Sequence, residues 1–296
     1  MASLKELRGR ITGVKSTRKI TNAMKMVAAS KLRRAQMQAE AARPYADAMR
    51  RMMAELATAT RGEDAASLPR LLAGTGKDQT HLVVVLTSDR GLAGGFNANI
   101  VRSARQLVDM LVSEGKTVRI LPVGRKGADI LVRYYPGMIT DRLSGSDGKD
   151  VGFDKATDIG SRIAAMLDAG EIDRCTLVYN RFLNAMTQVP VQAPLVPLSV
   201  PENDNAAPDA DTAQYEFEPD EATLLTQLLP RNLQVQIFSA MLESAAGEQG
   251  ARMTAMDNAS RNASKAIDRL SQKYNRTRQA NITNDLIEII SGAEAV

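Results

Sequence analysis

The C-terminal region carries a long, unbroken repeat of apolar and small residues, and this repeat limits the possible folds more than any other feature. The repeating positions follow one another at alternating intervals of three and four: Met253, Met256, Ser260, Ala263, Ile267, Leu270, Tyr274 and Thr277. This spacing places them on one side of a helix and is typical of a coiled-coil seam. The pattern continues forward to Ile289 and back towards Pro230, where the helix is expected either to begin or to kink.

The N-terminal region predicts a second helix of similar length. Its apolar residues also recur at intervals of three and four, and no proline occurs before Pro44. One helix could extend from residue 4 to about residue 61, a length of about 85 Å at 1.5 Å per residue. A helix with so narrow an apolar stripe is marginal in water by itself, so the two terminal helices are expected to pair. We assign seven residues to their common seam: Leu7, Ile11, Met24, Met256, Ile267, Leu270 and Tyr274.

Between the two helical regions, short apolar strands alternate with helices. Strands are expected at residues 81–87, 117–123 and 175–182, with a proline-containing edge strand at 189–200. Helices are expected at residues 97–113, 126–134 and 155–168. Residues 62–79 and 201–214 are polar or rich in proline and are expected to be loops or linkers. The alternation predicts a Rossmann-like α/β domain with a largely parallel sheet.

The fold class predicted from these patterns is α/β, with a long antiparallel coiled coil formed by the two terminal helices. The expected segments are an N-terminal coiled-coil helix at 1–61, a central α/β domain with its linkers at 62–214, and a C-terminal coiled-coil helix at 215–296. With 296 residues and 44% hydrophobic residues, the chain can form one large or two modest folded domains.

The charge is distributed unevenly along the chain. Residues 1–51 hold 13 lysines and arginines against three acidic residues, a net charge of +10, although the whole chain carries only +4. A basic end predicts acidic surroundings there, which leaves nucleic acid, anionic lipid or an acidic protein surface as candidate partners. No apolar stretch approaches the roughly 20 residues of a membrane helix, and the charged first 25 residues contain no signal-peptide core. Any membrane association is therefore expected to go through a partner.

Few residues suggest catalysis, and we expect no catalytic, metal-binding or cofactor-binding residues. Residues 88–97 follow an expected strand and precede a helix, where phosphate-binding loops occur. Their glycines match neither standard nucleotide-binding motif, so a tight turn is the favoured interpretation and nucleotide binding the alternative. His81 is the only histidine and is expected to be a surface or core residue without a catalytic or metal-binding role. Cys175 is the only cysteine and is expected to be a packing residue.

Nucleic-acid binding is the second alternative. Lys31, Arg33 and Arg34 could contact phosphates. The first forty residues contain no aromatic side chain on which a base could stack, and no DNA-binding motif is present. A test of binding to duplex at several salt concentrations would separate this alternative from protein binding.

Several stretches resemble one protein family specifically. Residues 4–11 (LKELRGRI) and 19–35 (KITNAMKMVAASKLRRA) closely resemble the N-terminal helix of the gamma subunits of F-type ATP synthases. Residues 88–95 (SDRGLAGG) are similar to the central loop of that family. Residues 251–259 (ARMTAMDNA) and 274–283 (YNRTRQANIT) resemble its C-terminal signature. The resemblance covers the whole chain in the same order.

The resemblance implies a non-catalytic central stalk. In that family the paired terminal helices insert into a hexamer of alternating alpha and beta subunits, and the α/β domain rests beside epsilon on the ring of c subunits. One copy turns with the ring as protons flow, and it couples this rotation to ATP synthesis at the catalytic sites of beta. The implied location is the cytoplasmic face of a bacterial inner membrane, as a peripheral protein that contacts the membrane only through the c-ring. A processed mitochondrial chain would look similar.

The resemblance also assigns contact residues. Arg278 and Gln279 match a pair that hydrogen-bonds a loop of the beta subunit, and Arg90 matches an arginine that meets an acidic segment of beta. Tyr215, Phe217 and Glu218 resemble the segment that rests on the c-ring. The basic N-terminal region then faces an acidic protein surface, and no nucleic acid is expected as a partner.

Overall fold

The computed structural model describes residues 3–59, 69–145, 151–198 and 221–294. The chain divides into two compact units: Met1–Ser30 with Arg252–Val296, which we call the terminal unit, and Lys31–Ala251, which we call the central unit. The predicted segment boundaries after residues 61 and 214 lie outside the described residues, so the three-segment division stays a prediction.

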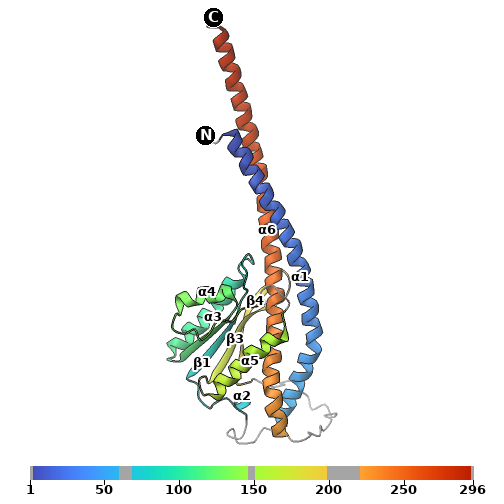
Figure 1. Ribbon diagram of the computed structural model, residues 1–296, viewed down its shortest axis with the longest axis vertical. Coiled ribbons are helices and arrows are strands. Elements are labelled where there is room, and N and C mark those ends of the chain that lie inside the picture. Colours follow the sequence, from blue (N-terminus) through green and yellow to red (C-terminus); the bar gives the residue numbers. More distant parts are fainter. Residues whose placement is uncertain (1–2, 60–68, 146–150, 199–220, 295–296) are drawn as a thin grey trace. The chain divides into compact units, whose positions relative to one another are not determined.

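The terminal unit consists of two helices that lie side by side and antiparallel (Figure 1). They are the first part of α1 (Leu4–Ala59) and the last part of α6 (Glu221–Glu294). The long antiparallel helix pair predicted from the repeat is confirmed. Small residues let the two helices approach closely, since Ala28 and Ala263 are both buried.

The sequence left open whether the C-terminal helix begins or kinks at Pro230. Helix α6 begins at Glu221, so the proline lies within it. Proline removes one helical hydrogen bond and crowds the preceding turn. Leu225, Leu229 and Leu233 recur at helical spacing around it, and all three are fully buried in the core. Their burial offsets the cost of the proline, so the helix continues through it.

The central unit contains a four-stranded sheet with the order β2-β1-β3-β4. The strands are β1 (Thr80–Leu86), β2 (Thr117–Val123), β3 (Arg174–Phe182) and β4 (Gln188–Val196). Strands β1 and β2 pair in parallel, as do β1 and β3, whereas β4 is antiparallel to β3. This confirms the largely parallel sheet, and β4 is the expected edge strand. Pro190 and Pro194 are tolerated there because an edge strand need not donate a hydrogen bond on its open side.

Helices cover both faces of the sheet, which explains why β1 is an uninterrupted apolar run. Along β1, Val83 and Val85 contribute to one core with α3 (Phe96–Ser113) and α4 (Arg125–Tyr134). Leu82, Val84 and Leu86 contribute to the other core with α5 (Phe153–Asp168) and the first part of α6. Figure 1 shows the strands between these two layers. The expected helices all occur, each with a start within two residues of the prediction.

The sequence pattern did not predict one short helix. Residues 62–79 were expected to form a loop, but α2 (Arg70–Ala73) forms a single turn within them. Its Leu71 is buried in the core beside the sheet, and the Leu71 carbonyl accepts a hydrogen bond from the Leu198 N–H at 2.9 Å. Four residues are too few to produce a helical repeat, so only this tertiary contact identifies the turn.

Candidate functional surfaces on the terminal helices and the 88–97 loop

The residues assigned to the seam differ in exposure. Leu7, Met256 and Ile267 are buried, and Ile11, Met24, Leu270 and Tyr274 are partly buried. Burial of positions on one side of α6 is the pattern expected when that side faces a partner helix. The pairing of all seven residues in one seam stays a prediction.

An ion pair connects the two helices of the terminal unit. Lys25 Nζ of α1 lies 2.6 Å from Asp257 Oδ1 of α6, and Arg261 Nε donates to the other carboxylate oxygen at 2.7 Å. The hydrogen bond from Lys25, followed by that from Arg261, holds the pKa of Asp257 below its usual value. The apolar repeat alone did not predict this contact. The available signal was that Lys25 and Asp257 each follow a proposed seam residue, Met24 and Met256, at positions where coiled coils place opposite charges.

The remaining surface of the terminal unit exposes large apolar side chains. On α1, Met26 and Val27 are 65% and 57% exposed. Near the end of α6 the exposed set is Ile282, Leu286, Ile287, Ile289 and Ile290. Contiguous apolar surface of this kind marks a site of protein contact.

Arg278 and Gln279 lie on the same part of α6 and are both exposed. Arg278, Ile282 and Leu286 follow at intervals of four and therefore share one side of the helix. A donor-rich side chain thus lies at the start of an exposed apolar stripe. This arrangement suits contact with a partner that offers a polar acceptor beside an apolar wall.

The 88–97 loop forms a tight connection between β1 and α3. The Ser88 N–H donates to Asn97 Oδ1 at 3.0 Å, and the Ser88 hydroxyl donates to the Arg90 carbonyl at 2.6 Å. Leu92 and Gly94 both have positive φ, at 64° and 56°. The loop is thus held by its own hydrogen bonds, and Arg90 at its bend is exposed.

Asp89, which follows β1, connects this loop to the start of α4. Its Oδ1 accepts the backbone N–H of Arg125, the first residue of α4, at 3.0 Å, and that of Gly145 at 3.0 Å. Helix N-termini attract anions, and here a side-chain carboxylate already supplies the negative charge. The start of α4 is therefore already occupied by a carboxylate. The 88–97 loop itself leads into α3, and its internal hydrogen bonds suit a structural turn.

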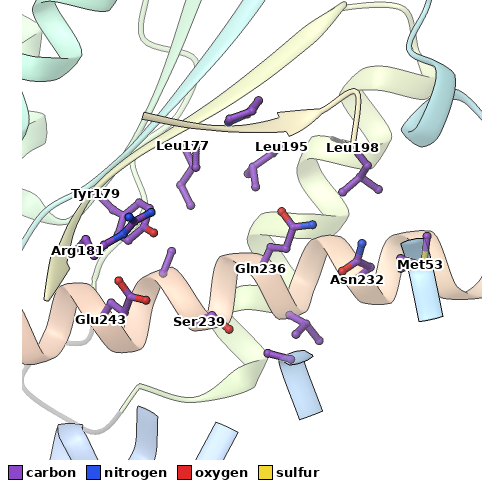
Figure 2. A pocket seen from close by; sticks show the side chains of 15 residues that line it. Met53, Leu177, Tyr179, Arg181, Leu195, Leu198, Asn232, Gln236, Ser239 and Glu243 are labelled. Atoms are coloured by element: carbon purple, nitrogen blue, oxygen red, sulfur yellow. The ribbon is translucent and has the colours of Figure 1, made fainter. Parts of the chain in front are cut away.

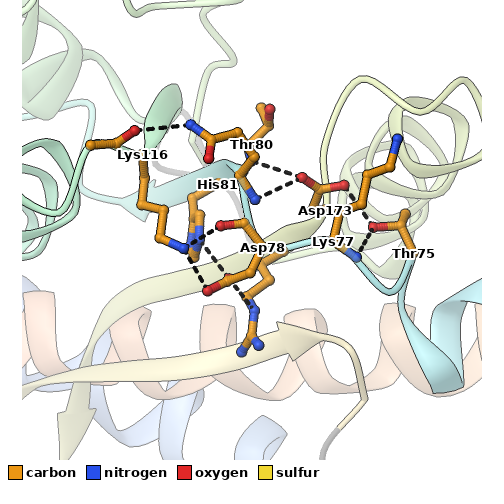
Figure 3. A network of polar contacts seen from close by, with 10 residues as sticks. Thr75, Lys77, Asp78, Thr80, His81, Lys116 and Asp173 are labelled. Atoms are coloured by element: carbon orange, nitrogen blue, oxygen red, sulfur yellow. Dashed lines mark hydrogen bonds and ion pairs between the residues drawn. The ribbon is translucent and has the colours of Figure 1, made fainter.

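A polar network lies where the three parallel strands begin (Figure 3). The Asp78 carboxylate is within 2.8 Å of Lys116 Nζ, 2.9 Å of His81 Nε2 and 2.5 Å of Arg174 Nε. The hydrogen bond from Lys116 is the main cause that keeps the pKa of Asp78 low. Ligand sites of parallel sheets lie at the opposite, carboxyl ends of the strands. This network therefore connects the starts of the three parallel strands. Within it, His81 contacts the Asp78 carboxylate.

The described ranges contain no group of three or more metal-ligating side chains. Cys175 is fully buried, and this burial raises the pKa of its thiol. Among the described helices, none combines the length and apolar character needed to cross a bilayer. Tyr215, Phe217 and Glu218, the predicted c-ring contacts, lie outside the described residues.

Comparison with known proteins identifies the family. The sequence model of a family described as ATP synthase matches residues 3–296. The chain is 98% identical to an ATP synthase gamma chain of Gluconobacter oxydans (strain 621H) and 65% identical to one of Gluconacetobacter diazotrophicus, over 100% of both chains in each case.

Solved structures agree. A structure of the central stalk and c-ring of the Tetrahymena thermophila mitochondrial ATP synthase contains a chain with a TM-score of 0.61 and 28% identity, covering 81% of this chain and 99% of that one. A chain in the Euglena gracilis mitochondrial ATP synthase reaches a TM-score of 0.68 over 99% of this chain and 94% of its own, and at 19% identity it supports the fold alone. Together with the full-length sequence matches, these likenesses show that the chain belongs to the gamma chains of ATP synthase.

Proposed function

We propose that this chain is the rotary central stalk of an F-type ATP synthase and that it couples rotation of the c-ring to ATP synthesis on the beta subunits. The observation that carries the proposal is the full-length match to gamma chains at up to 98% identity. The exposed apolar and basic surfaces of the terminal unit support it, because such surfaces need a partner.

The proposed partners are one hexamer of alpha and beta subunits, the epsilon subunit and the c-ring, with one copy of this chain per complex. Residues 1–51 carry a net charge of +10, which complements an acidic protein surface. We assign Arg278, Gln279 and Arg90 to contacts with beta, and Tyr215, Phe217 and Glu218 to the c-ring. The complex would lie at the cytoplasmic face of the bacterial inner membrane, with this chain attached through the c-ring.

Coupling in this proposal depends on differential contact. Each orientation of an asymmetric shaft contacts the three beta subunits differently. A contact shifts the conformational equilibrium of a beta subunit only if the stalk binds one of its conformations more tightly than the other. The chain then needs no catalytic residue of its own, since the catalytic sites are proposed to lie on beta.

Co-purification tests the proposal. The chain is expressed with ATP synthase alpha and beta subunits from a close relative, complexes are separated by size, and ATP hydrolysis is measured. The expected result is a complex with a single copy of this chain and higher turnover than alpha and beta alone. If the chain elutes free and turnover is unchanged, the stalk proposal is wrong. Duplex-DNA binding at several salt concentrations and an ATP titration of the isolated chain then test the two alternatives.

A further inference from the structure

In the central unit, the sheet meets the two long helices around a cavity of about 410 Å³. Strands β3 and β4, helix α6 and the second half of α1 all contribute to its lining, which is shown in Figure 2. Apolar packing therefore does not fill the space between the sheet and the helices at this level. Surfaces across a gap lose the close contacts that hold them in one relative position. The contacts at the ends of the cavity then decide how firmly the helices are fixed to the sheet.

Glu243 of α6 connects three elements at one end of this cavity. Its carboxylate accepts a hydrogen bond from the backbone N–H of Phe182, the last residue of β3. Arg181 of β3 and Arg43 of α1 attract the same carboxylate electrostatically, and Figure 2 shows Arg181 and Glu243 near each other on β3 and α6. Its Oε2 is buried without a hydrogen-bond partner among the described residues, so stability alone does not explain the contact. In some proteins, buried ionic groups are retained because they fix one arrangement.

Arg231 of α6 makes a second connection of the same kind. It lies twelve residues before Glu243, about 18 Å along the helix at 1.5 Å per residue, and its neighbour Asn232 lines the cavity. The Arg231 guanidinium lies 4.2 Å from the ring centroid of Phe153, the first residue of α5, and is attracted by the face of that ring. The Arg231 Nε donates to the hydroxyl of Tyr45 on α1 at 3.4 Å. Each of the two residues therefore joins α6 both to α1 and to the α/β domain.

We propose that Arg231 and Glu243 are positioning residues that fix the angle of α1 and α6 relative to the sheet of the central unit. The inference rests on the proposed stalk function and deepens it, because a shaft transmits torque only if its parts do not turn relative to one another. Apolar burial depends on area and has no preferred direction, whereas a hydrogen bond weakens steeply as its angle departs from linear. Two directional contacts at different heights on one helix therefore oppose twisting more than apolar area alone does.

Single-molecule rotation of the assembled complex tests this inference. The chain is assembled with alpha and beta subunits from a close relative, and the beta subunits are fixed to glass. A bead is attached to α3 through Gln106→Cys, since Gln106 is exposed and the natural Cys175 is fully buried. The spread of the bead angle during pauses measures how far the α/β domain twists relative to the fixed hexamer. Arg231→Met with Glu243→Gln is expected to widen the angular variance about twofold, because a neutral acceptor bonds about half as strongly as a carboxylate. ATP turnover at saturating ATP should stay near wild type.

The matched control is Arg119→Met with Glu171→Gln, which removes the same two residue types from an ion pair outside α1 and α6 and should leave the variance unchanged. Arg43→Met with Tyr45→Phe removes the partners on α1, where both side chains are exposed, and is expected to widen the variance as well. Thermal melting verifies folding, and the α1 variant tests the same contacts if the α6 variant does not fold. Unchanged variance in a folded variant of either helix, or equal widening in the control, would overturn the proposal. A wild-type complex that does not rotate would instead contradict the proposed function, and this inference with it.

Discussion

Lys25 and Asp257, which are 232 residues apart in the sequence, form an ion pair between α1 and α6 with 2.6 Å between Nζ and Oδ1. The pair lies at the edge of the apolar contact, where charged residues select the register of coiled coils. Arg261 shares the same carboxylate, so removal of Asp257 affects two cations at once.

A double-mutant cycle with Lys25→Met and Asp257→Asn is expected to show favourable coupling in thermal unfolding of the full chain. The coupling should be small because both side chains are partly exposed, and it should decrease as salt is added. Arg10→Met is the control, because Arg10 pairs with Glu6 within α1 and cannot connect the helices. Additive effects of the two single changes at low salt would show that the pair does not stabilise the terminal unit.

Ile267→Asp is expected to prevent assembly with alpha and beta subunits. Ile267 is 8% exposed, and a charge placed there without a partner is expected to destabilise the helix pair by about 3 kcal/mol or more. Yield of the complex after separation by size is the measurement. Lys265→Asp places the same charge at an exposed position two residues earlier and should leave the yield near wild type. A normal yield for Ile267→Asp would place that residue outside the helix contact.

Replacing Arg278 and Gln279 with Ala is expected to lower ATP hydrolysis by the assembled complex roughly tenfold, the effect of losing about one hydrogen bond to a charged group. Assembly should be retained because both residues are exposed in the chain itself. Lys273→Ala, an exposed change on the same helix, is the control. Unchanged turnover in the Arg278 and Gln279 variant would count against their contact with beta.

Asp173 is expected to make the stability of the central unit depend on pH. Burial raises the pKa of this carboxyl, but hydrogen bonds from the Thr75 hydroxyl and the Thr80 and Gln79 N–H groups outweigh it, so the pKa of Asp173 lies below its usual value. Because the folded pKa is depressed, the stabilisation is present above the usual pKa and is lost as the pH falls through the folded value.

Asp173→Asn should therefore lower the free energy of unfolding by about 1–3 kcal/mol at pH 7, since one acceptor is replaced by a donor that faces N–H groups. The difference from wild type should shrink below about pH 4. Denaturant titrations at several pH values measure it, and Asp129→Asn at an exposed position is the control. A difference that stays constant down to pH 3 would contradict the assigned ionisation.

Gly124→Ala is expected to destabilise the central unit by more than about 3 kcal/mol. Gly124 has φ of 103°, and an added Cβ would lie 2.0 Å from the Thr87 carbonyl oxygen. Gly137→Ala is the matched control, since a Cβ there meets nothing within 4 Å. Thermal melting of both variants is the measurement. Equal melting temperatures would show that the ends of β1 and β2 can move apart without lowering the stability of the central unit.

The sequence predicted those parts of the fold that repeat locally. The apolar run in β1 and the regular spacing from Met253 to Thr277 each identify an element by themselves. The choice between a helix start and a kink at Pro230 stayed open in the sequence, because the burial of Leu225 and Leu229, which outweighs Pro230, is a tertiary effect.

The structural role of Asp89 could not be predicted in the same way. Its two backbone partners, Arg125 and Gly145, lie 36 and 56 residues further along the chain, and no local pattern connects them. The Lys25 and Asp257 contact is more distant still, at 232 residues, although the seam predicted which sides of the helices would meet. The family resemblance supplied Arg278 and Gln279, and no physical pattern in the sequence distinguishes those two from other exposed polar residues on α6.

The exposed apolar stripe near the end of α6 has a consequence for how a cell must handle this chain during synthesis. Ile282, Leu286 and Ile289 are each more than half exposed in the chain by itself. Until a partner covers them they resemble the surfaces that chaperones retain and that proteases of quality control recognise. The steady-state amount of the chain in a cell should therefore be limited by the supply of its partners rather than by its own rate of translation.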